Sequence, residues 1–275
     1  ANINHIKTIS LQDRLISYMF NHKCFFDLYL LAGTEFQKIL TSKYDVSNYK
    51  TLGLTRVNLI KKSPSKKIEK YLNNKKGIIT CLLLTPNSDW KTHINGEDGT
   101  SIKSSLNFCE KVVKLAKNFH NYNFIIKFKI LDECNDHFFI NSINKIISSS
   151  QNIYFDHNKD VSSANLVAHS KLVIGKYSTI LDESLASGID VLVDDEENFI
   201  SSFSFFKTNR FHIIKNFDDL LFCSKNLLNR DGTFFENYKN SKNKYISGYL
   251  TNKGEIGTPK KIIEIIENFI IENRV

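Results

Sequence analysis

The chain has 275 residues, of which 41% are hydrophobic and 24% charged; this composition excludes a disordered or collagen-like protein and fits one or two globular domains. The net charge is +8 at pH 7, but no zinc-finger, helix-turn-helix or RNP-like pattern accompanies the scattered lysines, so nucleic acid is not an expected partner. A basic surface of this kind suits an enzyme that handles anionic donors or contacts anionic lipid headgroups as a peripheral membrane protein.

The cysteines show neither a CxxC pair nor a histidine at metal-ligand spacing. They are Cys24, Cys81, Cys109, Cys134 and Cys223. Reduced thiols, with no disulfide framework and no metal site, are therefore expected. The sequence has no uncharged apolar run of about 18 residues and no secretion signal, so we expect a cytoplasmic protein that also works at the inner face of the plasma membrane.

Residues 1–62 predict a partial N-terminal domain. Its expected elements are a helix over Ser10–Asn21, a strand over Phe25–Leu31, a helix over Glu35–Thr41 and a strand-like run over Thr51–Ile60. The lysine-rich residues 63–76 follow as an interdomain linker with a short helix over Pro64–Asn73. The N-terminal segment is shorter than a usual domain of ~100–150 residues, so we expect an upstream segment or a partner chain to complete it.

From Gly77 onward, strands alternate regularly with amphipathic helices. Strands are expected at Ile78–Leu84, Phe124–Ile130, Asn152–Phe155, Leu172–Ile174 and Val191–Val193, and helices at Ser101–Phe119, Asp136–Ser148, Ser162–Ala168 and Thr258–Glu272. This alternation predicts an α/β fold with a Rossmann-like parallel sheet, helices on both of its faces, and Val173 and Leu192 in adjacent strands. In the last helix, Thr258 is the expected N-cap and Pro259 the first helical residue.

The segment Lys171–Val193 predicts a strand, a turn, a helix and a second strand. Ser178 and Thr179 stand where the helix begins, at the carboxyl end of the first strand. Such a place can hold a phosphate, because free backbone N–H groups and the helix dipole both point there. The alternative is that these two residues only cap the helix and that Asp182 and Glu183 only complement its dipole.

Five motifs follow one another along the chain. They are TLGLTRVNLI, ITCLLLTPNSDW, FIIKFKI, GKYSTILDESLASGIDVLV and KYISGYLTNKGEIGTPKKIIEII. In this order they resemble the nucleotide-binding half of GT-B glycosyltransferases, most closely the CDP-glycerol glycerophosphotransferases of teichoic acid and capsule synthesis. Gly53, Arg56 and Asn58 match the G-x-P-R-x-D segment of that group, and Tyr177 begins its Tyr-Ser-Ser/Thr motif.

The resemblance implies a transferase that moves a glycosyl or glycerophosphoryl group. The donor would be CDP-, CMP- or UDP-linked, the acceptor a cell-surface polysaccharide or a lipid-linked glycan, and no cofactor would be needed. Residues 77–275, with the C-terminal helix, would form the nucleotide-binding domain, and residues 1–62 the end of an acceptor-side domain.

The donor-binding residues expected from this resemblance are Lys127, Tyr177, Ser178, Thr179 and Glu183. The two hydroxyl residues would stabilise the charge that develops on the leaving nucleotide, and Lys127, at the end of the neighbouring strand, would supply a cation. The alternative for Lys127 is a solvated lysine at a strand end. Glu183 would accept hydrogen bonds from ribose hydroxyls, and Tyr177 is expected to pack.

The catalytic base is expected at one of three places. The group has a histidine after a Lys-Pro pair, but here Phe128 and Lys129 follow Lys127. The candidates are therefore Lys129 itself, His5, which stands where the group has another histidine, and His93 in the long polar loop. Because the acceptor-side domain is short, we expect the chain to bind a cytidine or uridine nucleotide but to transfer poorly by itself.

Two other classes of function remain open. A nucleotide-sugar epimerase would use the same fold but needs paired acid and base carboxylates, for which Asp89, Glu97 and Asp98 are the loop candidates. The other class is a non-catalytic nucleotide-binding domain of a larger synthase, consistent with the missing histidine.

Overall fold

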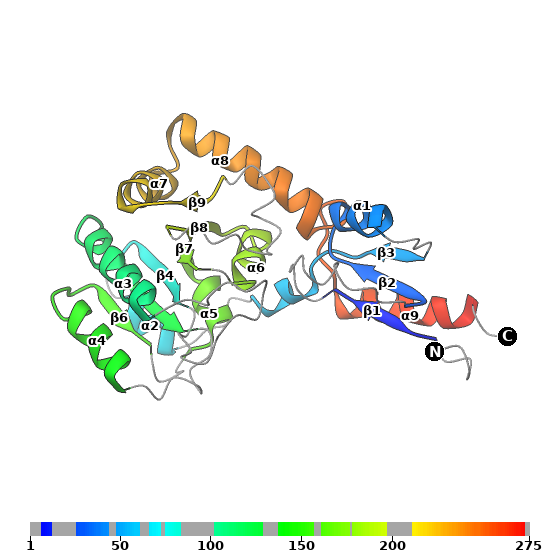
Figure 1. Cartoon of the computed structure of the whole chain (residues 1–275), viewed down its shortest axis with the longest axis horizontal. Helices are drawn as coiled ribbons and strands as arrows, with labels where there is room; N and C mark the ends of the chain where they lie inside the picture. Colours follow the sequence, from blue (N-terminus) through cyan, green and yellow to red (C-terminus); the bar gives the residue numbers. More distant parts are fainter. Residues whose placement is uncertain are drawn as a thin grey trace.

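The chain forms two lobes, a larger one on a six-stranded sheet and a smaller one on a three-stranded sheet (Figure 1). The computed structural model describes residues 7–12, 26–43, 48–60, 66–72, 75–83, 102–128, 137–156, 161–176, 178–196 and 211–272. The first strand and the last helix both belong to the smaller lobe (Figure 1). Among these residues, no helix is both long enough and apolar enough to cross a membrane.

All strand pairs of the larger sheet are parallel, in the order β6-β5-β4-β7-β8-β9. The strands are β4 (Gly77–Leu83), β5 (Tyr122–Phe128), β6 (Ile153–Phe155), β7 (Ser170–Gly175), β8 (Asp190–Asp194) and β9 (Ile213–Ile214). The predicted pairing is confirmed, since Val173 lies opposite Val191 and Ile174 opposite Leu192. From β4 the chain builds outward through β5 and β6 and then returns to the other side of β4 with β7. The strand order therefore reverses between β4 and β7.

Helices cover both faces of this sheet, as predicted. They are α2 (Lys66–Leu72), α3 (Ile102–Ala116), α4 (His137–Ile147), α5 (Ser163–Ala168), α6 (Ile180–Ala186), α7 (Phe217–Asn229) and α8 (Gly232–Tyr245). On one face, Phe108 of α3, Phe139 of α4 and Leu220 of α7 pack against Phe124 and other side chains of the strands. The opposite face is covered by α2, α5 and α6. This two-sided burial explains why the strands are continuous apolar runs.

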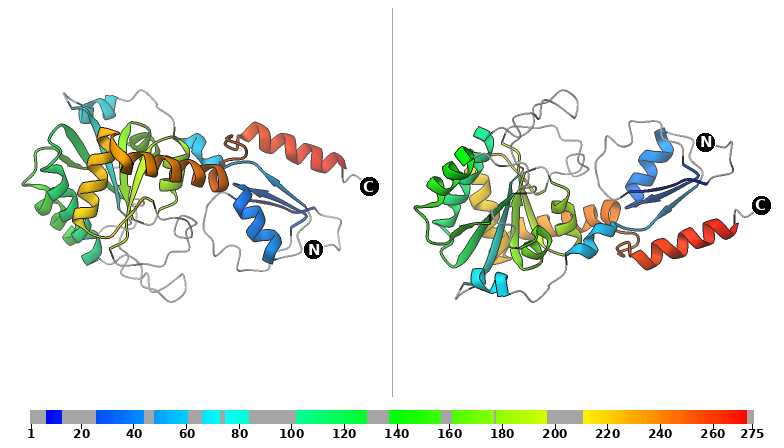
Figure 2. Two further views of the ribbon diagram at one scale, coloured as in Figure 1. Left: turned by 90° about the horizontal axis from the view of Figure 1, so that it is seen from above. Right: turned by 90° about the horizontal axis from the view of Figure 1, so that it is seen from below.

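The smaller lobe is a parallel sheet between two helices. Its strands are β1 (Ile9–Leu11), β2 (Leu28–Leu31) and β3 (Tyr49–Thr51), in the order β1-β2-β3, and its helices are α1 (Thr34–Lys43) and α9 (Pro259–Glu272). The helices lie on opposite faces of the sheet (Figure 2). Because side chains alternate along a strand, Leu31 packs with Phe36 of α1, whereas Leu28 and Leu30 pack with Phe269 of α9.

Two local predictions in this lobe were wrong. Where the helix from Ser10 was expected to begin, the chain forms strand β1, because residues 9–11 pair with β2. Thr8 also donates two hydrogen bonds of 2.8 Å to the carboxylate of Asp27. Residues 13–25 lie outside the described ranges. The strand expected over Thr51–Ile60 ends at its first residue. Gly53 turns the chain with a φ of 91°, and a 3₁₀ helix, η3 (Thr55–Leu59), follows.

The last helix was expected to belong with the nucleotide-binding domain, but it packs on the smaller sheet. Its predicted start is confirmed, since the hydroxyl of Thr258 accepts a hydrogen bond of 3.3 Å from the Lys261 amide and Pro259 is the first helical residue. Its amphipathic face alone could not tell which of two apolar sheets it covers. The domain boundaries at residues 62 and 76 stay a prediction.

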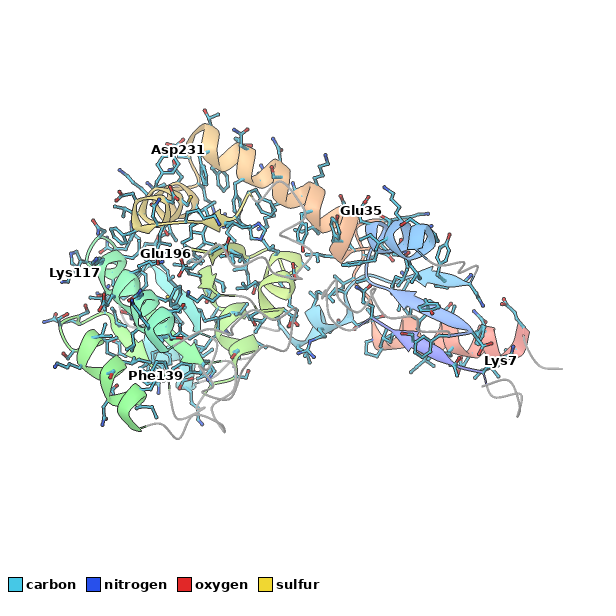
Figure 3. The ribbon with its side chains drawn as sticks, in the orientation of Figure 1. Lys7, Glu35, Lys117, Phe139, Glu196 and Asp231 are labelled. Carbon is cyan, nitrogen blue, oxygen red and sulfur yellow. The ribbon has the colours of Figure 1, made fainter. Side chains whose placement is uncertain are left out.

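The two lobes are joined by a helix that runs from one to the other. Helix α8 continues into a π-helical turn, η5 (Ile246–Leu250), beside α1 (Figure 1). Side chains of this turn belong to an apolar cluster that extends from Val173 of β7 to Leu31 of β2. At the crossing, a Cβ on Gly33 would lie 2.6 Å from the Tyr249 Cα. Glu35, labelled in Figure 3, lies at the same crossing.

Replacing Gly53 with alanine should lower the free energy of unfolding by about 2–4 kcal/mol, because the new Cβ adds a clash to a left-handed backbone. The Cβ would lie 2.8 Å from both the Gly257 nitrogen and the Ile256 Cα. Gly254→Ala is the matched control, with a φ of 86° and no atom within 4 Å of its Cβ; it should cost only about 1–2 kcal/mol. Equal losses for both variants in urea denaturation would contradict the packing argument.

Candidate functional site

The point where the strand order reverses lies between the carboxyl ends of β4 and β7. Open α/β sheets bind ligands at this point, because the loops that leave the two strands diverge and open a crevice. Ser178 and Thr179 lie here, between the end of β7 and the start of α6, and both are almost fully buried. The Thr179 side chain makes no capping hydrogen bond to the helix. A capping hydrogen bond therefore does not explain why a threonine stands at this position.

Lys127 is not a solvated lysine at a strand end. Its ammonium donates a hydrogen bond of 2.7 Å to the carboxylate of Asp156, which directly follows β6, and both side chains are buried. Lys127 was expected on the strand next to the one that leads to Ser178. Instead, β4 lies between β5, which carries Lys127, and β7. The local charge of Lys127 is balanced by Asp156, and its predicted contact with a donor phosphate stays a prediction.

Glu183, on α6, forms an ion pair with the smaller lobe. The Nε of Arg56, on η3, donates to its Oε1 at 2.8 Å, and the Glu183 side chain is 3% exposed. The other two residues that match the G-x-P-R-x-D segment hold this part of the chain within the smaller lobe. Gly53 packs against the backbone of residues 255–257, and the amide of Asn58 donates to the Gly257 carbonyl at 2.6 Å.

A buried charge cluster at the carboxyl ends of β7 and β8 was missed from the sequence. Asp194 ends β8 and is fully buried; it lies 2.7 Å from the ammonium of Lys111 on α3 and 3.6 Å from that of Lys176. Lys176 also donates to the Ser104 hydroxyl at 2.5 Å, and Lys111 contacts Glu196, labelled in Figure 3, at 2.7 Å. The acidic run that directly follows the buried strand was the sequence signal for this cluster.

In this cluster Lys111 is held in its charged form. Burial by itself lowers the pKa of its ammonium, but the carboxylates of Asp194 and Glu196 outweigh burial and raise the pKa above its usual value. Lys176, which directly follows β7, is only 2% exposed. The cluster therefore fixes α3 against the ends of the two strands beside Ser178.

Asp182, next to Glu183, is a buried carboxyl group. Burial raises its pKa to about 8, while the hydrogen bond of 2.6 Å from the Tyr245 hydroxyl opposes this and the charge of Glu183 adds to it. At neutral pH the group is therefore mostly protonated. Glu183 thus contacts Arg56 on η3, and Asp182 contacts Tyr245 at the end of α8. These two adjacent residues of α6 therefore contact both chain segments that connect the lobes.

Several predicted site residues lie outside the described ranges. They are His5, His93, Lys129 and Tyr177, together with the loop carboxylates Asp89, Glu97 and Asp98.

Among the predicted site residues that the structure describes, Ser178, Thr179 and Glu183 lie together at one end of α6. In the part of the chain that the structure describes, no group of three or more His, Cys, Asp or Glu side chains could hold a metal ion.

Several solved structures are similar in fold to this chain. The S. aureus MnaA–UDP co-structure matches with a TM-score of 0.63 and 14% identity, over 98% of this chain and 70% of that one. A putative UDP-N-acetylglucosamine 2-epimerase from Listeria monocytogenes matches with a TM-score of 0.58 and 14% identity, over 90% of this chain and 61% of that one. The chain has the GT-B fold. The fold expected from the motifs is thereby confirmed.

A variant of the wall teichoic acid polymerase TagF, soaked with CDPG, matches this GT-B chain with a TM-score of 0.53 and 12% identity, over 90% of this chain and 57% of that one. The chain therefore spans 57–61% of the length of the TagF and Listeria structures. No protein-family profile matches the sequence, and no curated protein sequence matches it. At 12–14% identity, the matches establish the fold alone.

Proposed function

We propose that the chain is a nucleotide-dependent transferase of cell-envelope synthesis. It would move a glycosyl or glycerophosphoryl group from a CDP-, CMP- or UDP-linked donor to a polysaccharide or lipid-linked acceptor. The reaction would take place in the cytoplasm at the inner face of the plasma membrane, where the basic surface contacts anionic lipid and a further domain or partner chain helps to hold the acceptor.

One observation carries the proposal: Ser178 and Thr179 lie at the point where the strand order of a parallel sheet reverses. Two structures with this fold were obtained with UDP or with CDPG, which are pyrimidine nucleotides or their derivatives. The burial of both hydroxyl residues and the missing side-chain cap at Thr179 are consistent with groups reserved for a ligand.

An epimerase is the second candidate. It is supported by the TM-scores, since the putative epimerase from Listeria matches with 0.58 and the TagF structure with 0.53. The two functions differ in what happens to the donor. Incubation with UDP-N-acetylglucosamine and no acceptor should leave the sugar configuration unchanged in a transferase, whereas NMR detection of the 2-epimer would favour the epimerase.

Replacing Ser178 and Thr179 with alanine together should weaken binding of UDP or CDP by about tenfold or more, since a hydrogen bond to a charged group contributes ~1.5–3 kcal/mol. Isothermal calorimetry on the full chain measures this loss. Ser187→Ala is the matched control, because its hydroxyl donates to the Glu183 carbonyl at the other end of α6. Equal nucleotide affinity of the double variant and the control would rule out this phosphate site.

The base candidates are tested by turnover. In the proposed transferase, replacing the true base among Lys129, His5 and His93 should lower the rate of transfer by about 10²–10⁴-fold while donor affinity is retained. Each residue is replaced singly by glutamine, and donor consumption is followed with acceptor present. Three variants that all keep the wild-type rate would show that the base lies elsewhere.

A further inference from the structure

The ion pair between Arg56 and Glu183 links the smaller lobe to the helix beside the candidate nucleotide site. The guanidinium Nε lies 2.8 Å from Oε1 of the carboxylate, and the two residues are 127 positions apart in the sequence. The Glu183 side chain is 3% exposed, while that of Arg56 is 35% exposed. The arginine thus approaches a buried carboxylate from a partly solvated side.

The backbone that carries Arg56 is fixed without any help from Glu183. The amide of Leu54 donates to the Leu250 carbonyl at 2.8 Å. The side-chain amide of Asn58 donates to the carbonyls of Thr55 at 2.8 Å and Gly257 at 2.6 Å, and Val57 is buried in the cluster between the lobes. Because η3 is held on both sides of Arg56, the guanidinium is presented in a defined place.

An arginine held in this way defines how the carboxylate is oriented. A guanidinium is a planar, rigid set of donors, so a bond to one oxygen restricts rotation of the carboxylate about its last bond. Binding groups that are oriented before the ligand arrives lose less entropy when it binds. Glu183 lies in the first turn of α6, directly after Ser178 and Thr179, which precede the helix.

We propose that Arg56 is a positioning residue, which orients the Glu183 carboxylate to accept hydrogen bonds from the ribose hydroxyls of the bound nucleotide. This inference rests on the proposed function, because it requires a nucleotide at the end of β7. Arg56 itself need not touch the ligand. In this arrangement Glu183 of the larger lobe contacts the ribose, and Arg56 of the smaller lobe holds the Glu183 carboxylate in its orientation.

The test compares UDP with 2′-deoxy-UDP, and CDP with 2′-deoxy-CDP, by calorimetry on the full chain. The wild type should prefer the ribonucleotide by about tenfold or more, since its carboxylate accepts from the 2′-hydroxyl. Arg56→Ala and Glu183→Gln should each reduce this preference at least about fivefold and leave deoxynucleotide affinity almost unchanged. The double variant should lose no more than either single variant, because both act through one carboxylate.

Arg56→Lys keeps the positive charge but not the planar geometry, and should restore part of the preference. Lys38→Ala is the control, because it removes an exposed ion pair of 2.6 Å with Glu35 in the smaller lobe. If Arg56 only holds the two lobes together, Arg56→Ala will lower the melting temperature or weaken the binding of ribo- and deoxynucleotides equally, and the ribose preference will persist. This result overturns the inference but leaves the proposed function in place. If the wild type binds none of the four nucleotides, both are overturned.

Discussion

The Asp194→Asn variant is expected to lose about 3–5 kcal/mol of unfolding free energy, because it breaks a buried ion pair by removing one partner. Asparagine has the shape of aspartate, so the loss measures charge and not volume. Lys111 keeps its contact with Glu196, which is 48% exposed. Lys176, whose side chain is 2% exposed, loses its contact of 3.6 Å with the Asp194 carboxylate. Urea denaturation at pH 7 measures the loss.

A surface ion pair provides the control for Asp194. Glu236 lies 3.9 Å from Lys239, and both side chains are more than half exposed. Because such pairs contribute little, Glu236→Gln should change the unfolding free energy by less than about 0.5 kcal/mol. Similar small changes for both variants would show that Lys176 does not depend on Asp194 for its burial. The Lys176→Met and Asp194→Asn double variant should recover part of the loss, since it removes the buried ammonium together with the carboxylate.

Wild-type protein is expected to lose stability as the pH rises from about 4 to about 8, relative to the Asp182→Asn variant. The pKa of Asp182 is raised from 3.8 to about 8, first by burial. Between these values the folded state keeps a proton that the unfolded state has lost, so each pH unit destabilises the folded state by up to about 1.4 kcal/mol. Over this range the difference in unfolding free energy between the two proteins changes by an amount on the order of 5 kcal/mol, and above the folded pKa it stays constant.

His212 acts in the opposite direction over part of this range. Burial lowers its pKa from 6.5 to about 3, so between these values the unfolded state binds the extra proton and a rise in pH favours the folded state. The contributions of His212 and Asp182 oppose each other up to about pH 6.5. Above that pH only Asp182 of the two still acts, so the loss of wild-type stability should be clearest between pH 6.5 and 8.

The measurement is urea denaturation of both proteins at pH 5, 6.5 and 8. Tyr245→Phe is the informative second variant, because the hydrogen bond from this hydroxyl lowers the Asp182 pKa. Without that bond the pKa should rise further and the pH range of the loss should extend upward. A stability difference between wild type and Asp182→Asn that does not change with pH would show that Asp182 is ionised in the folded protein.

The sequence alone predicted the parallel sheet and its helices, because those signals are local. The apolar runs of β4, β5, β7 and β8 and the helical spacing of α3 follow from the burial of neighbouring residues. The start of α9 at Thr258 and Pro259 was also predicted, since a cap depends on residues three positions apart. The turn after β7 was recognised for the same reason. Short elements of the smaller lobe were predicted less well, because three-residue strands carry almost no periodicity.

The partners of the charged residues were decided only by the tertiary structure. Lys127 pairs with Asp156, Arg56 with Glu183 and Lys111 with Asp194, across 29 to 127 positions of sequence. No local pattern encodes such pairs, because they depend on which strands and lobes come together. The sequence therefore placed Ser178 and Thr179 at the end of a strand, whereas only the packing of η3 against α6 brought Arg56 to the carboxylate beside them.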